Sequence, residues 1–108
     1  MKRLSTDVIS RRSAAAAGYL AGSIRAARQA RGLSQADLAE RARISVPTLS
    51  RLERGHPGIA LWVWLGVMEV LGMLDIFETL RDPKTEALAR AKIDRPVRKK
   101  KSSVDLEF

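Results

Sequence analysis

The sequence contains no cysteine, which excludes disulfide bonds, thiolate catalysis and cysteine-ligated metal ions. It has one histidine, His56, and neither a second histidine nor an acidic cluster accompanies it, so no metal or acid–base site is predicted. Ser5, Ser10 and Ser13 have no base partner, which argues against a hydrolase. We therefore expect a protein that is not an enzyme, with no catalytic residue, no metal ligand and no cofactor.

Long apolar segments are also missing. The most apolar run, Ile59 to Met68, is too short to cross a bilayer and is followed by Glu69. The start of the chain has no apolar core of a signal peptide, because Asp7 and two arginines interrupt it. We expect a soluble, cytoplasmic protein with no membrane partner.

Positive charge is what the sequence has in excess. Twenty lysines and arginines oppose twelve aspartates and glutamates, which gives a formal net charge of +8. A small domain this basic usually binds a polyanion, most often nucleic acid. The other interpretation, that the charge only keeps the protein soluble, stays open at this point.

The order of caps, apolar residues and breakers predicts an all-α fold with five to six helices, no β pattern and no internal repeat. We expect a flexible basic arm over residues 1–12, one compact domain over 13–92 and a disordered basic tail with an apolar end over 93–108. Ser13, Ser34 and Ser45 are the expected N-caps of the first three helices. The predicted helical segments are 13–32, 33–42, 46–55, 59–74, 75–80 and 83–92.

The fourth predicted helix is apolar on two sides. One stripe has the spacing of a core face and consists of Leu61, Trp64, Leu65, Met68 and Leu71. A second stripe predicts a surface that pairs with a second copy of the chain, through Trp62, Val63, Val67, Val70 and Leu74. The alternative is a helix that is buried on all sides in its own core.

Two short helices joined by a tight turn predict a helix-turn-helix. The segment RGLSQADLAERARISVPTLSRLERG resembles the helix-turn-helix of the phage-repressor-like family, the XRE or Cro/C1 type, over about residues 20–72. Gln35 opens the second helix and Ala39 is small where the two helices cross. Ile44 fills the turn, and Leu49 lies on the inner side of the third helix.

The resemblance has one departure and one structural implication. The family usually has glycine at the position of Arg43, where the chain turns with positive φ, and a side chain there costs roughly 1 kcal/mol. The resemblance also implies an ion pair between Arg28 and Glu53 that ties the first helix to the third.

In a helix-turn-helix the second helix of the motif enters the major groove with its N-terminal residues at the base edges. Arg51 is the candidate for bidentate binding to guanine, worth ~1–3 kcal/mol of discrimination, although it could instead be an ordinary solvated residue. The predicted base contacts are Ser45, Val46, Pro47, Thr48, Ser50 and Arg51. The predicted phosphate contacts are Gln35, Arg43 and Arg54.

Among repressors of this type, the chain is most similar to the HipB-like antitoxins, which repress their own operon and bind a HipA-type kinase toxin. The likeness is a compact helix-turn-helix, a short helical extension and a tail that ends in Leu106, Glu107 and Phe108. The strand signal that some members have after the fourth helix is missing. The resemblance implies that the tail docks on the kinase, through Val104, Leu106 and Phe108.

These observations predict a DNA-binding repressor and antitoxin, with three partners: a near-palindromic DNA duplex, a second copy of the chain and a HipA-like kinase. One alternative is a free-standing XRE-type regulator with no toxin partner, whose tail serves only its own fold or stability. An adaptor that never binds DNA is hard to reconcile with the net charge and with Arg51.

Overall fold

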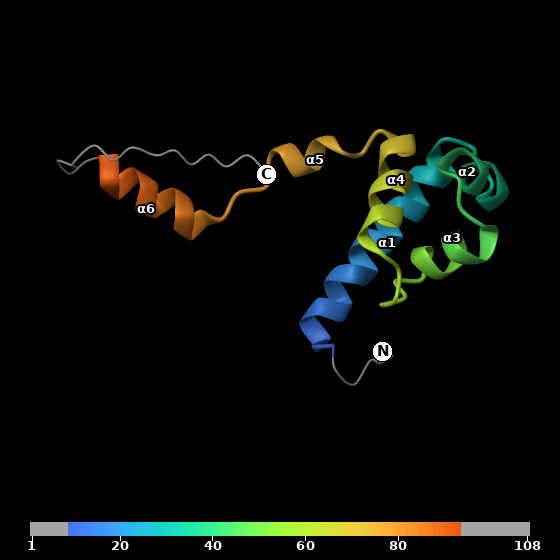
Figure 1. Ribbon diagram of the computed structural model, residues 1–108, viewed down its shortest axis with the longest axis horizontal. Helices are drawn as coiled ribbons and strands as arrows, with labels where there is room; N and C mark the ends of the chain where they lie inside the picture. The colour runs from blue at the N-terminus through green and yellow to red at the C-terminus, as the bar shows by residue number, and fades with distance from the viewer. Residues whose placement is uncertain (1–8, 94–108) are drawn as a thin grey trace. The chain divides into compact units, whose positions relative to one another are not determined.

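The computed structural model describes residues 9–93. Within that range the chain is helical and has no strand (Figure 1), which confirms the predicted all-α fold class. The predicted partner-binding residues Val104, Leu106 and Phe108 lie outside the described residues, as do most of the predicted N-terminal arm and tail. The helices are α1 (Arg11–Ala30), α2 (Gln35–Ala42), α3 (Val46–Glu53), α4 (Leu61–Leu71), α5 (Asp75–Glu78) and α6 (Pro83–Ile93).

The chain divides into two compact units, with the boundary between Ile76 and Phe77 inside α5. The second unit contains α6, which begins at Pro83 as predicted. Just before it, the Asp82 carboxylate accepts hydrogen bonds from the Thr85 hydroxyl (2.6 Å) and the Lys84 N–H (3.2 Å). These two bonds lower the pKa of Asp82 below its ordinary value. The side chains of α6 are exposed.

The first unit has one apolar core, to which α1, α2, α3 and α4 all contribute. α2 packs against α3 and α4, and α1 packs against the same two helices (Figure 1). Burial of each large aliphatic side chain stabilises the fold by roughly 1.5–3 kcal/mol. The buried members of the core are Ile24, Leu38, Ala39, Leu49, Leu52, Val67, Met68 and Leu71.

The first helix begins earlier than the sequence predicted. Its N-cap is Ser10, whose hydroxyl oxygen accepts a hydrogen bond from the Ser13 N–H at 3.0 Å. The prediction of Ser13 as the N-cap was therefore wrong. Arg11 and Arg12, which we had placed in the flexible arm, belong to the first turn of α1.

The buried face of α4 contains residues from both predicted stripes. Val67, assigned to the dimer surface, has no exposed surface and packs beside Met68 and Leu71 in the core. Leu61, assigned to the core, is 67% exposed at the start of the helix. Residues spaced by three and four positions share one helix face, so Val67 and Met68 both point inward above Leu71. Val67 is therefore a core residue and Leu61 is not, so both assignments were wrong.

No helix in the described part of the chain combines the length and the apolar character needed to cross a membrane.

Candidate DNA-binding site

The amino end of α2 is fixed by a capping box. The Ser34 hydroxyl oxygen accepts from the Asp37 N–H, and the Asp37 carboxylate accepts from the Ser34 N–H, both at 3.0 Å. The bond from the Ser34 backbone, followed by the bond with the Ser34 side chain, holds the pKa of Asp37 below its ordinary value of 3.8. This arrangement confirms Ser34 as the predicted N-cap and sets the direction in which α2 starts.

The turn between α2 and α3 passes through Arg43 in the left-handed conformation, with φ 59° and ψ 44°. Among the described residues, Arg43 is the one non-glycine residue with positive φ. The Arg43 N–H donates to the Glu40 carbonyl at 3.2 Å, and the Ile44 N–H donates to the Ala39 carbonyl at 3.0 Å. The predicted positive φ at Arg43 is confirmed. The two backbone hydrogen bonds of the turn form although the residue is not glycine.

The amino end of α3 is also capped by a serine side chain. The Ser45 hydroxyl oxygen accepts from the Thr48 N–H at 3.2 Å and donates to the Thr48 hydroxyl at 2.8 Å. Pro47 lies in the first turn, where its missing N–H costs no hydrogen bond. Leu49 and Leu52 anchor the inner face of the helix in the core.

The outer face of α3 carries the predicted base-contacting residues. Ser45, Val46, Pro47 and Arg51 are exposed, while Thr48 and Ser50 are half-buried. The Ser50 hydroxyl accepts a hydrogen bond from Arg54 Nη1 at 3.3 Å. All six candidates therefore lie on α3 or on its cap, with the core on the opposite side.

Behind α3, Arg28 and Glu53 form a bidentate ion pair. Arg28 Nε lies 2.7 Å from Glu53 Oε2, and Arg28 Nη2 donates to Glu53 Oε1 at 3.0 Å. Arg28 Nη1 also donates to the Leu33 carbonyl at 2.9 Å, just before α2. Both charged residues are buried, and the predicted link between the first and third helices is confirmed.

A third side chain joins this pair. Gln35 Nε2 donates to Glu53 Oε1 at 3.0 Å, so the first residue of α2 is tied to the last residue of α3. The sequence predicts a phosphate contact for Gln35 and does not predict its hydrogen bond to Glu53. No signal in the sequence indicates it, because the two residues are 18 positions apart and meet only when the helices pack. The predicted phosphate contact of Gln35 stays a prediction.

Charge is distributed unevenly along the described chain. Residues 9–60 contain nine arginines and three carboxylates, and two of these carboxylates are used inside the motif, by Asp37 in its cap and by Glu53 in its ion pair. Arg43, Arg51 and Arg54 are all exposed. The segment that carries α1, α2 and α3 therefore presents a surface suited to a polyanion.

Residues 24–73 match the family model described as Helix-turn-helix. This part of the chain is an XRE-type helix-turn-helix domain, and such domains are the DNA-binding part of transcription regulators. The comparisons with curated proteins and with solved structures found no match.

Proposed function

We propose that the protein is a sequence-specific transcriptional repressor that reads an operator with the outer face of α3. The observation that supports this proposal is the position of Arg51, which is exposed on α3 while Leu52, the next residue, is fully buried. A helix held so firmly from behind presents its outer side chains in one orientation. Such an arrangement favours direct contacts with base edges in the major groove.

Within this proposal each side chain has a role that its chemistry permits. Arg51 grips O6 and N7 of a guanine with two parallel hydrogen bonds. Val46, Pro47 and the methyl group of Thr48 pack against a thymine methyl. Ser45 and Ser50 hydroxyls supply further polar contacts to bases, and the phosphate contacts come from Gln35, Arg43 and Arg54.

We propose a second copy of the chain as a further partner, because one small module contacts few base pairs. Trp62 at the start of α4 is 82% exposed, which leaves a large apolar surface in water. Val63, Val70 and Leu74 are half-buried and pack against the core from the same region of the chain. A two-fold dimer would set two recognition helices about 34–36 Å apart on a near-palindrome.

The antitoxin role is the finer part of the proposal. Its support is the resemblance to HipB-like antitoxins and the apolar side chains of Val104, Leu106 and Phe108, which suit a protein partner. The alternative is a regulator with no toxin. Affinity capture of partners with the full chain and with a chain lacking Asp105 to Phe108 separates the two: a captured HipA-like kinase supports the antitoxin, and its absence while promoter binding persists excludes it.

Selection from a randomised pool of DNA duplexes tests the repressor proposal. The wild-type chain should enrich one sequence, and Arg51→Ala should lose the preference for guanine at one position per half-site, by roughly 5- to 150-fold for ~1–3 kcal/mol. Arg41→Ala is the matched control, because Arg41 is exposed on α2 and has no assigned base contact. Enrichment of no sequence by the wild-type chain would exclude sequence-specific repression.

A further inference from the structure

The first turn of α1 carries two arginines that the helix-turn-helix motif leaves unused. Arg11 and Arg12 are exposed, and the first buried residue of the helix, Ala21, comes almost three turns later. The amino-terminal half of α1 therefore extends beyond the part that packs in the core. From Ile9 to Ala36 the chain has no aspartate or glutamate, so no carboxylate of that segment offsets the two charges.

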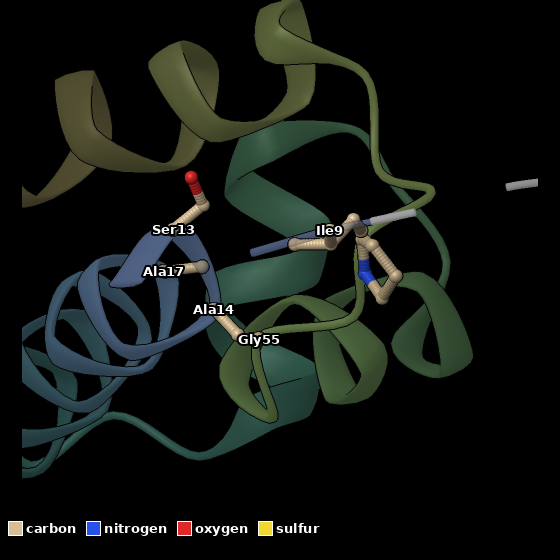
Figure 2. Close-up of a pocket in the computed structure, with 6 residues that line it drawn as sticks. Ile9, Ser13, Ala14, Ala17 and Gly55 are labelled. Carbon is tan, nitrogen blue, oxygen red and sulfur yellow. The ribbon is translucent and has the colours of Figure 1, made fainter. Parts of the chain in front are cut away.

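The start of α1 lies against the carboxyl end of α3. A hollow of about 240 Å³ lies there (Figure 2), and residues of both segments line it: Ile9, Ser13, Ala14 and Ala17 from the start of α1 and the residues before it, and Gly55 and Pro57 from the segment after α3.

Gly55 lies near the backbone of α1. It follows the C-cap of α3 with φ 75°, and a Cβ atom built on it would lie 3.6 Å from the Ala17 carbonyl oxygen and from the Gly18 Cα, which is an ordinary contact distance. The start of α1, which carries Arg11 and Arg12, therefore borders the segment that directly follows Arg54.

The length of α3 indicates how far its carboxyl end would lie from the DNA backbone. Eight residues of helix measure about 12 Å. The major groove is ~12 Å wide, so a helix of this length seated in it has a sugar–phosphate strand close to its ends. The residues packed at the carboxyl end of α3 then approach that strand. Arginine is the side chain whose planar fork matches a phosphate.

We propose that Arg11 and Arg12 bind backbone phosphates that flank the bases read by α3. The proposal rests on DNA binding by α3 and adds a second, sequence-independent contact area made by α1. Its partner is the same duplex that α3 binds in the proposed function. Binding there strengthens affinity and fixes the register of α3 without changing which bases are preferred.

The test compares salt titrations of DNA binding for four forms of the full chain: wild type, Arg11→Ala/Arg12→Ala, Arg11→Lys/Arg12→Lys and Arg25→Ala/Arg31→Ala. Arg25 is exposed on the same helix and Arg31 is exposed at its C-cap, so their removal changes the net charge equally. Loss of two phosphate contacts should reduce the slope of log K against log salt by about 1.8. The lysine variant should keep the slope, and the Arg25/Arg31 variant should lose much less.

Phosphate-ethylation interference locates the contact. Ethyl groups on one or two phosphates outside the bases read by α3 should weaken binding of the wild-type chain and leave the Arg11→Ala/Arg12→Ala variant unaffected. An unchanged slope, or an identical interference pattern for both proteins, overturns the proposal while operator binding through Arg51 stands. If the wild-type chain shows no specific, salt-dependent binding at all, the proposed function and this inference fail together.

Discussion

Arg28 and Glu53 face each other across the back of the helix-turn-helix, with Arg28 Nε 2.7 Å from Glu53 Oε2. The same glutamate accepts from Gln35, and the same arginine donates to the Leu33 carbonyl. One buried pair thus connects α1, the start of α2 and the end of α3. The orientation of α3 therefore depends on two charges that are buried in the domain.

Removal of either partner of this pair should strongly destabilise the domain. Arg28→Ala leaves the buried Glu53 carboxylate without its counter-charge, and the expected loss is about 3–5 kcal/mol in the free energy of unfolding. Chemical denaturation monitored by circular dichroism measures it. Replacement of both residues, Arg28→Met with Glu53→Leu, should recover most of the stability, because no unpaired charge remains.

Glu40→Ala, on the exposed face of α2, is the control for the loss of one carboxylate. A single Glu53→Ala variant as stable as this control would contradict a structural role for the pair.

Arg43→Gly should stabilise the turn. Glycine adopts φ 59° without the contact that a Cβ atom makes, and relief of about 1 kcal/mol corresponds to a rise in Tm of about 4–8 °C. Arg43→Ala removes the charge but keeps the strain, so its Tm should stay near that of the wild type. Arg41→Gly, inside α2, should lower the Tm instead.

The two glycine variants use the same residue type at neighbouring positions and should shift the Tm in opposite directions. A fall in Tm for Arg43→Gly would show that the arginine side chain, rather than backbone strain, determines the stability of this turn.

The helix-turn-helix could be predicted from the sequence because its signals are local. Ser34 and Ser45 each accept a hydrogen bond from the backbone N–H three residues later. Gly55 has a positive φ, which glycine adopts without strain. The ion pair between Arg28 and Glu53 was inferred only by resemblance to a family. The hydrogen bond from Gln35 to Glu53 joins α2 to α3 and forms only when these helices pack together. No local sequence pattern predicts it.

Two predictions failed where the sequence offered equivalent choices. Ser10 and Ser13 can both cap a helix, and the alanine-rich segment after them does not discriminate between the two. In α4 nearly every residue is apolar, so the spacing of apolar residues does not indicate which face of the helix is buried. Contacts with α1 and α2 decided that Val67 points inward and that Leu61 stays exposed.

The capping box of α2 should make stability depend on pH. The folded-state pKa of Asp37 is below its ordinary value of 3.8, so its contribution is present above that pH and is lost as the pH falls through the folded-state pKa. Asp37→Ala should therefore be less stable than the wild type at pH 7. The gap between the two proteins should narrow as the pH falls through the folded-state pKa, because the protonated carboxyl no longer accepts as strongly. Thermal unfolding across this range measures the difference.

Ser34→Ala removes the reciprocal partner and should cost about 1 kcal/mol at pH 7. A gap between wild type and Asp37→Ala that is the same at pH 7 and pH 2 would contradict the ionic contribution to the cap.

Substitutions at Trp62 and Val67 distinguish an effect on dimerisation from an effect on folding, because both residues lie on α4 but only Trp62 is exposed. Trp62→Asp places a charge where the side chain meets water in the monomer, so the free energy of unfolding of the monomer should be unchanged. If a second copy covers this surface, the charge becomes buried on association and the dimer should dissociate. Sedimentation velocity over a concentration series measures this.

Val67→Asp has the opposite expectation. The carboxylate would lie in the core beside Met68 and Leu71, and the domain should unfold rather than dissociate as a folded monomer. If the Trp62→Asp chain is dimeric at the same concentrations as the wild type, the dimer forms through a different surface. A wild-type chain that is monomeric throughout would remove the two-fold arrangement, and operator half-sites would then have no fixed spacing, since only a dimer sets the distance between two recognition helices.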